Sequence, residues 1–116
     1  MVRPTPPYIP DRGDFIKINF SPQAGHEQAD WRPALVLTPS EYNRRAGLAV
    51  VCPITNQVKG YPFEVEIPRK LPVSGAILAD HLKSLDWQSR KAKAAGKCPA
   101  ETLEEVQGKL RALLDL

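Results

Sequence analysis

The apolar residues of this 116-residue sequence fall into short runs that proline, glycine and polar residues interrupt. In Phe15–Phe20, apolar and polar residues alternate from the second residue on, which is the period of a half-buried strand. Ala34–Leu37 and Leu48–Ile54 are continuous apolar runs bounded by turn residues or proline, and they predict buried strands. Phe63–Ile67 and Gly75–Leu85 predict two further strand regions. The pattern is that of a mainly β fold.

The period of the apolar residues changes near the C-terminus. Within Leu103–Leu114 they recur at spacings of three and four, which predicts an amphipathic helix beginning just after Pro99. A shorter helical turn over Glu41–Arg45 would be capped by Ser40 and ended by Gly47. Short strands closed by one helix predict a small antiparallel barrel with a C-terminal helix packed on it. Part of that helix could instead meet a second subunit.

The size and composition bound the number of domains. A chain with 42% hydrophobic and 25% charged side chains fits one compact domain over residues 1–116. Residues 1–10 form a proline-rich lead that could be flexible and that lacks the apolar stretch of a secretory signal. No apolar run approaches the roughly 18 residues that span a bilayer. Two cysteines, Cys52 and Cys98, are too few for a disulfide scaffold, so a cytoplasmic location is expected.

The sequence offers no recognisable cofactor or metal motif. Cys52, Cys98, His26 and His81 lack the close pair spacings of zinc ligands. There is neither a P-loop nor a glycine-rich dinucleotide motif, so we expect no cofactor and no metal. The net charge is only +3, but the segment Leu82–Cys98 holds five basic side chains against one acidic. Such a cluster suits a polyanion or an acidic protein tail, and a solvated surface explains it equally well.

Three groups of polar residues interrupt the predicted strands. Arg32 lies just before a proline and a buried strand, and Glu27, five residues earlier, can fold back toward it. The simplest explanation of this pair is a structural ion pair. Thr55 ends an apolar strand, where its hydroxyl could satisfy a turn or lie beside Arg32 if the two strands are neighbours. His81 and Lys83 would share one face of a strand, and a surface histidine is the simplest interpretation.

Several strings recur in a known family. They are G-H-E-Q-A-D-W-R-P-A-L-V-L-T-P, P-I-T, K-G-Y-P-F-E-V and A-D-H-L-K-S, preceded by Pro10-Asp11-x-Gly13-Asp14. Together they cover nearly the whole chain and resemble the MazF/PemK family of bacterial toxins, the toxin components of type II toxin–antitoxin systems. The resemblance implies an SH3-like barrel, usually a homodimer, that cleaves single-stranded RNA, chiefly messenger RNA, at specific sequences without metal and so inhibits growth. It also implies a cognate antitoxin that lays an acidic, flexible segment along the RNA groove.

The resemblance implies catalytic roles for three residues. Without metal, the economical reaction is attack of a ribose 2′-hydroxyl on the adjacent phosphate, giving a 2′,3′-cyclic phosphate and a 5′-hydroxyl. Arg32 matches the family's catalytic arginine and would stabilise the phosphorane and donate a proton. Thr55 matches its catalytic hydroxyl residue and would hydrogen-bond the scissile phosphate. Arginine is a poor base because its pKa exceeds about 12, so Glu27 would assist the 2′-hydroxyl or orient Arg32.

The remaining implied site residues are RNA contacts. They are Phe20, Gln28, Lys59, Asp80, His81, Lys83 and Arg90. Many relatives have D-Q-x-K-S where this chain has D-H-L-K-S at residues 80–84, so an imidazole replaces an amide and could change which bases are read. Two alternatives stay open. One is an acid/base pair of His26 and His81. The other is a non-catalytic module or toxin that binds RNA or a protein target such as a topoisomerase.

Overall fold

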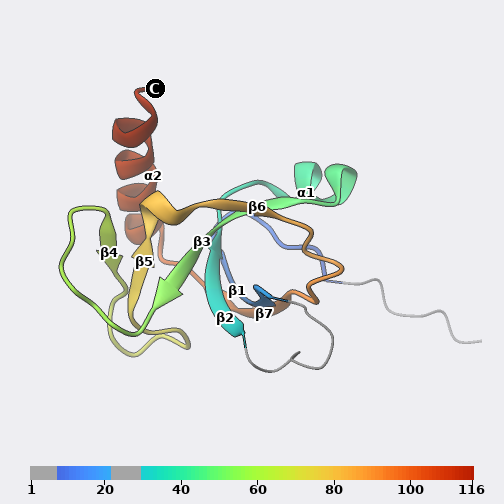
Figure 1. Cartoon of the computed structure of the whole chain (residues 1–116), viewed down its shortest axis with the longest axis horizontal. Coiled ribbons are helices and arrows are strands. Elements are labelled where there is room, and N and C mark those ends of the chain that lie inside the picture. The colour runs from blue at the N-terminus through green and yellow to red at the C-terminus, as the bar shows by residue number, and fades with distance from the viewer. Residues whose placement is uncertain (1–7, 22–29) are drawn as a thin grey trace, which may run out of the picture.

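The computed structural model describes residues 8–21 and 30–116, which form seven strands, two α-helices and one short 3-10 helix (Figure 1). In chain order the elements are β1 (Asp14–Asn19), β2 (Trp31–Val36), α1 (Ser40–Ala46), β3 (Ala49–Thr55), β4 (Glu64–Glu66), β5 (Ala76–Leu78), η1 (Ala79–His81), β6 (Lys83–Leu85), β7 (Lys93–Lys97) and α2 (Ala100–Leu114).

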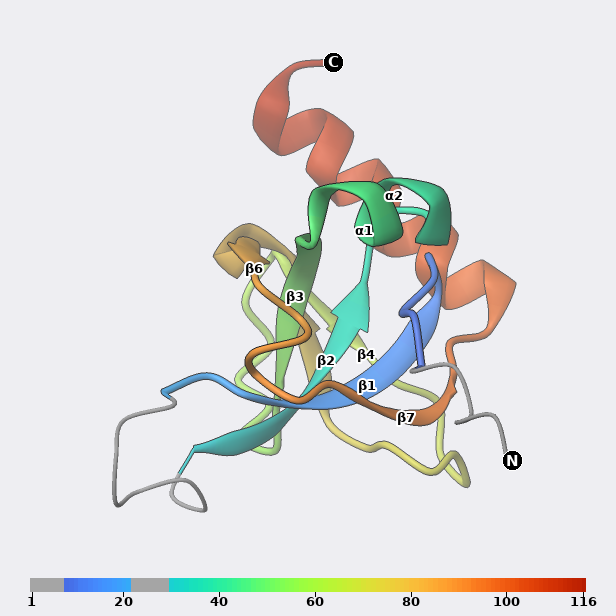
Figure 2. The same cartoon turned by 90° about the vertical axis from the view of Figure 1, so that its right-hand side faces the viewer.

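The seven strands form one antiparallel sheet in the order β4-β5-β3-β2-β1-β7, with β6 also pairing with β3. The predicted mainly β fold with a C-terminal helix is confirmed. The sheet is open: within the described residues, the outer strands β4 and β7 do not pair with each other. Figure 2 shows β1 and β2 as a long twisted hairpin, with β7 alongside β1.

The predicted strand region Gly75–Leu85 is divided in the structure. Strand β5 pairs with the end of β3, and β6 pairs with its beginning, while η1 connects the two. The interruption coincides with Pro53 in the middle of β3, which has no N–H to donate to a neighbouring strand. His81 therefore lies in η1 and Lys83 in β6, so the two do not share one continuous strand.

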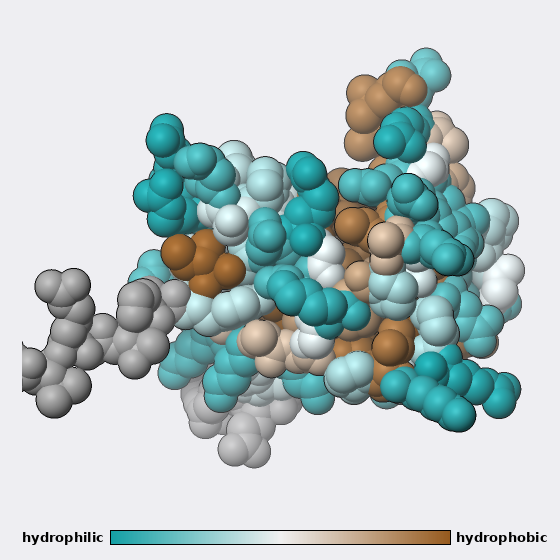
Figure 3. Space-filling model, turned by 180° about the vertical axis from the view of Figure 1, so that it is seen from behind, coloured by the Kyte–Doolittle hydropathy of each residue, from teal (hydrophilic) through white to brown (hydrophobic). Residues whose placement is uncertain are grey.

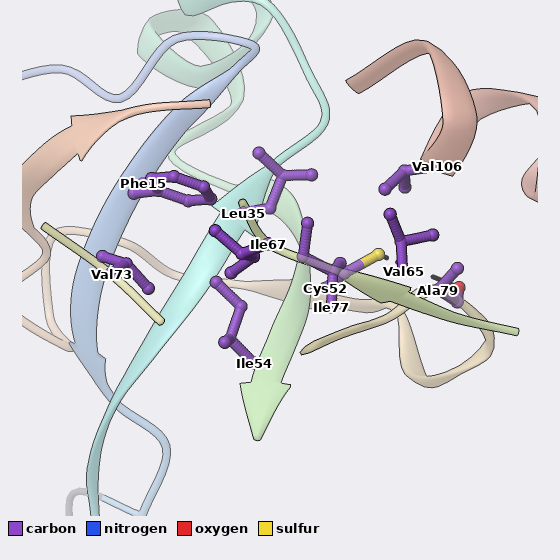
Figure 4. Packing of buried hydrophobic residues seen from close by; sticks show 10 residues of the cluster. All are labelled: Phe15, Leu35, Cys52, Ile54, Val65, Ile67, Val73, Ile77, Ala79 and Val106. Carbon is purple, nitrogen blue, oxygen red and sulfur yellow. Dashed lines mark hydrogen bonds between the residues drawn. The ribbon is translucent and has the colours of Figure 1, made fainter. Parts of the chain in front are cut away.

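The core lies on both faces of the sheet. Phe15 joins one buried cluster with Leu35 and Val106, which brings the apolar stripe of α2 against the sheet (Figure 4). The next residues on β1 that point the other way, Ile16 and Ile18, join a second buried cluster. Burial on both faces fixes the register of β1 against β2, because a slip of one residue would exchange the two sets of side chains.

The predicted helix boundaries are correct except at the start of α1. Helix α2 begins directly after Pro99, as predicted. Gly47, which directly follows the last residue of α1, has the left-handed backbone conformation with φ 72° and ends that helix, also as predicted. The predicted capping role of Ser40 is wrong, because Ser40 is the first helical residue and follows Pro39. Its N–H instead donates to Asp11 Oδ1 at 2.8 Å, and this bond lowers the pKa of Asp11.

The free end of α2 extends beyond the strands (Figure 1), and the space-filling view shows hydrophobic residues there (Figure 3). Leu114 is 52% exposed and Leu116 is 86% exposed. None of the helices in the described part of the chain has the length and apolar character needed to cross a membrane.

Candidate active site

Two neighbouring cavities share Thr55, Leu78 and His81 in their walls. The larger has a volume of about 280 Å³ and is also lined by Arg32, so we call it the Arg32 cavity. The smaller has a volume of about 180 Å³ and is also lined by Tyr61, so we call it the Tyr61 cavity. Both form where the end of β3 meets η1.

Strand pairing brings Arg32 and Thr55 to the Arg32 cavity. In the ladder between β2 and β3, Ala34 pairs with Pro53. Continuing that antiparallel register by two residues sets Arg32 across from Thr55, with both side chains on the same face of the sheet. Both residues line the Arg32 cavity. The sequence predicted that Thr55 would lie beside Arg32 if their two strands were neighbours. Strands β2 and β3 are neighbours, so this condition is met.

Arg32 is held by an ion pair, and most of the surface of its side chain stays exposed to solvent. Its Nε donates to Asp30 Oδ1 at 2.8 Å. The Arg32 side chain is 63% exposed and that of Asp30 20%. The pKa of Asp30 is lowered by a side-chain hydrogen bond from Ser21 and, further, by the bond and charge of Arg32. The guanidinium is thus oriented through Nε while its outer nitrogens can meet an anion.

The backbone around Thr55 is closely constrained. The Thr55 hydroxyl accepts the N–H of Gln57 at 3.0 Å, which forms a turn after β3. Directly before strand β5, Gly75 has φ 114°, and a Cβ at that position would lie 2.1 Å from the carbonyl oxygen of Thr55. Only glycine combines that conformation with so close an approach. The position of Thr55 therefore depends on Gly75.

An aromatic ring and a lysine line another part of the Arg32 cavity. Lys83 Nζ lies 5.7 Å from the centroid of the Phe20 ring, within the range of a cation–π contact. Arg90 lines neither cavity. Its Nη1 donates to the carbonyl oxygens of Asn19 at 3.2 Å and Phe20 at 2.7 Å. The guanidinium of Arg90 thus holds the end of β1 and, through it, Phe20.

The Tyr61 cavity is built on a loop that Glu64 orders. Glu64 Oε1 accepts the backbone N–H of Lys59 at 3.0 Å and that of the next residue at 2.9 Å. Lys59 Nζ lies 5.9 Å from the centroid of the Tyr61 ring. On the other wall, His81 Nε2 lies 3.7 Å from Asp80 Oδ1. The two cavities together present aromatic rings, cations and an imidazole on one continuous surface.

Neither cysteine fits a nucleophile. Burial raises the pKa of the Cys52 thiol to about 12 and that of Cys98 to about 11, so both stay protonated near neutral pH. Within residues 8–21 and 30–116, no three His, Cys, Asp or Glu side chains are grouped as metal ligands would be.

Of the ten site residues named from the sequence, seven line the two cavities: Phe20, Lys59, Arg32, Thr55, Asp80, His81 and Lys83. Arg90 lies outside the cavity walls, and Glu27 and Gln28 lie outside the described residues, as does His26. The sequence reasoning missed Asp30, Tyr61 and Glu64. All three fall within the strings D-W-R-P and K-G-Y-P-F-E-V, which could have drawn attention to them.

Comparison with known proteins identifies the family of this chain. The family described as "PemK-like, MazF-like toxin of type II toxin-antitoxin system" matches residues 11–114. The endoribonuclease toxin MazF of Escherichia coli is 42% identical over 107 residues, which cover 92% of this chain and 96% of that protein. The crystal structure of MazF from Deinococcus radiodurans has a TM-score of 0.85 at 55% identity, covering 94% of this chain and 99% of the other.

A MazE–MazF crystal structure from the same organism also has a TM-score of 0.85, at 49% identity, covering 94% of this chain and 98% of that chain. The chain belongs to the PemK-like, MazF-like toxin family of type II toxin–antitoxin systems.

Proposed function

We propose that this protein is a toxin that acts as a sequence-specific, metal-independent endoribonuclease on single-stranded messenger RNA. The observation that carries the proposal is the cavity that Arg32 and Thr55 line together from neighbouring strands, with Lys83 beside them. Membership of the toxin family and the relatives named as endoribonucleases support it. Growth inhibition follows from loss of messenger RNA.

The reaction is an internal transesterification of RNA. The ribose 2′-oxygen forms a bond to the adjacent phosphorus while the bond from phosphorus to the 5′-oxygen breaks. The products carry a 2′,3′-cyclic phosphate and a 5′-hydroxyl. The step needs removal of the 2′-hydroxyl proton, neutralisation of the charge on the phosphorane and delivery of a proton to the departing oxygen.

Each proposed catalytic residue meets one of these needs. Arg32, fixed through Nε by Asp30, would place its outer nitrogens on the non-bridging oxygens of the phosphorane and would donate a proton to the departing 5′-oxygen. Thr55 would hydrogen-bond the scissile phosphate while its oxygen accepts the N–H of Gln57. Glu27, which lies outside the described residues, would accept the 2′-hydroxyl proton or orient Arg32.

The neighbouring side chains would bind the RNA on either side of the cleaved bond. Phe20 and Tyr61 offer rings on which unpaired bases can stack, and each ring has a lysine above it, Lys83 and Lys59. These cations would contact phosphates, and such contacts weaken as the salt concentration rises. Asp80, His81 and Gln28 would read base edges. Arg90 would act indirectly by holding the backbone at Phe20.

The same surface would receive the antitoxin. An acidic, flexible segment of a cognate antitoxin would lie on these cations and block the entry of RNA. The solved relatives include MazE–MazF structures from Deinococcus radiodurans. We further propose that residues 1–116 form a single domain that belongs to the SH3-like barrel folds. We also propose that the protein works as a homodimer in the cytoplasm. The exposed leucines at the end of α2 offer apolar surface for such a contact.

A direct test is incubation of the purified protein with a mixed RNA in excess chelator. Discrete fragments are expected with the unchanged protein and with an Arg45→Ala control, whose side chain is exposed on α1 away from both cavities. The fragments should vanish with Arg32→Ala and with Thr55→Ala. Intact RNA that still binds the protein would favour a non-catalytic module, and binding of a protein target in place of RNA would favour the other toxin class.

A further inference from the structure

The hairpin of β1 and β2 has a second polar face, opposite the one that carries Arg32. Within this ladder Trp31 pairs with Asn19, which lies two residues from Lys17 on the same strand. Successive residues of a strand point to opposite faces, so Trp31 and its neighbour Arg32 lie on different faces of the sheet. Lys17 shares the face of Trp31, because paired residues project to the same side. The RNA surface proposed above lies on the Arg32 face and leaves this second face unassigned.

Strand β7 adds another lysine to the second face. Lys93 pairs with Lys17 in the ladder between β7 and β1, and Figure 2 shows the two strands side by side. Lys93 Nζ lies 5.4 Å from the centroid of the Trp31 ring, within the range of a cation–π contact. Both lysines are exposed, and the ring is half-buried. Within the described residues, no carboxylate forms an ion pair with either lysine. Two neighbouring cations beside an accessible ring therefore face the solvent.

A hollow of about 180 Å³ extends this surface toward the candidate active site, and we call it the Lys17 cavity. Its walls are formed by Lys17, Pro33, Asn56, Pro72, Val73 and Ser74. Asn56 directly follows Thr55, which lines the Arg32 cavity. The end of β3 therefore separates the Lys17 cavity from the Arg32 cavity, and a flexible strand that passes over this end reaches both.

Charge and shape favour single-stranded RNA as the occupant of the second face. Neighbouring lysines attract the phosphates of a strand, and a half-buried indole ring gives an unpaired base a surface on which to stack. An acidic peptide would pair with the lysines but has no planar base for the ring. A lysine beside an aromatic ring also occurs in both active-site cavities, at Phe20 and at Tyr61.

We propose that Lys17, Trp31 and Lys93 form a second RNA-binding site, the Trp31 site. It holds the part of the substrate strand that leaves the Arg32 cavity over the end of β3. The Trp31 site adds affinity for long RNA and takes no part in breaking the bond. This inference rests on the proposed function, because it extends the path of the same substrate.

The test measures binding of two oligonucleotides built around the cleavage site mapped with mixed RNA. One has about 6 nucleotides centred on the cleaved bond, and the other extends the same sequence on both sides to about 16. Both carry a 2′-deoxyribose at the attacking position, so they bind without being cut. Trp31→Ala should weaken binding of the long oligonucleotide about 10-fold and change that of the short one less than about 2-fold. Trp31→Tyr, which keeps a ring, should restore most of the lost affinity.

The salt dependence of binding tests the two lysines. Each lysine that neutralises a phosphate of a single strand adds about 0.7 to the slope of log affinity against log salt concentration. The double variant Lys17→Ala and Lys93→Ala should therefore lower this slope by about 1.4 for the long oligonucleotide and leave that for the short one unchanged. The matched control, Arg44→Ala with Arg45→Ala, removes the same charge from α1, where both arginines pair with Glu41 and line none of the cavities. It should keep both slopes.

Three outcomes would overturn the Trp31 site. Equal weakening for both lengths would mean that the substitutions act through Arg32. Unchanged binding of the long oligonucleotide would mean that RNA does not reach this face. If the lysine variant instead lost binding of a polyglutamate peptide, the occupant would be an acidic protein segment.

Cleavage keeps this test separate from that of the proposed function. With ribose at the attacking position, every variant named here should cut the short oligonucleotide at the unchanged rate. An unchanged protein that binds both oligonucleotides but cuts neither would contradict the proposed function, while the comparison of binding would still decide the Trp31 site.

Discussion

Replacing Gly75 with alanine should displace the end of β3 and with it Thr55. The new Cβ would lie 2.1 Å from the carbonyl oxygen of Thr55 and 2.9 Å from its carbonyl carbon. Both contacts are with backbone, so no side-chain rotation can relieve them. Either β5 or the end of β3 has to move, although Thr55 pairs with Ala76 in this ladder.

The expected loss of stability follows from three contributions. A non-glycine residue held at φ 114° costs about 1–3 kcal/mol. Forcing extra volume into a closely packed position costs about 1–3 kcal/mol more. Alanine recovers about 0.4–1 kcal/mol because it restricts the unfolded chain. The net loss is about 3 kcal/mol, a large share of the roughly 5–15 kcal/mol that stabilises a typical domain.

Urea unfolding followed by the fluorescence of the buried Trp87 measures this loss. Gly47→Ala is the matched control, because Gly47 also has positive φ, 72°, but a Cβ there meets nothing within 4 Å. The control should lose only about 1 kcal/mol. At a temperature where both variants are folded, Gly75→Ala should also cleave RNA more slowly. If Gly75→Ala loses no more stability than Gly47→Ala, the dependence of Thr55 on this close approach is refuted.

Three further predictions concern Gly108, the two cysteines and the ion pair of Asp30 with Arg32. Gly108 lies in the middle of α2, and a Cβ there would meet nothing within 4 Å. Gly108→Ala should therefore raise the free energy of unfolding by about 0.5–1 kcal/mol in the same urea assay. A decrease would contradict the open space around this position. Burial raises the pKa of Cys52 to about 12 and that of Cys98 to about 11. At pH 8 both thiols should therefore react with a thiol reagent far more slowly in the native protein than in the urea-unfolded protein, and Cys52 should be the slower of the two. Equal rates in the native and unfolded proteins would contradict the burial. Because the pKa of Asp30 lies below its usual value of 3.8, its ion pair with Arg32 should persist at pH 4 and be lost only as the pH falls further. Asp30→Asn should slow single-turnover cleavage roughly 10-fold by freeing Arg32 to move, and an unchanged rate would remove the orienting role.

The sequence predicts the apolar strands of this fold well and the polar edge strand not at all. β1, β2 and β3 have periodic or continuous apolar residues because each is buried on at least one face. β7 consists of lysine, alanine and glycine, residues with low strand propensity, and it forms because β1 offers a partner for hydrogen bonding. Lysines on such an edge also discourage pairing with other chains.

In the candidate site, too, some contacts are between residues close in sequence, and others depend on how the strands pair in the sheet. The prediction that a carboxylate would hold Arg32 named Glu27, which stays a prediction because it lies outside the described residues. The described partner of Arg32 is Asp30, only two residues away. The meeting of Arg32 with Thr55 depends on the register between β2 and β3, which no local pattern specifies. Their proposed roles came from family resemblance.

The central claim is that Arg32 and Thr55 act together on one phosphodiester bond. A double-mutant cycle of single-turnover cleavage rates in chelator tests it most directly, with Arg32→Ala, Thr55→Ala and the double variant measured on one oligonucleotide. Residues that act as a unit give strongly non-additive losses, so we expect the double variant to be hardly slower than the slower single variant. Losses that simply multiply would mean that the guanidinium and the hydroxyl act independently, which would contradict the account.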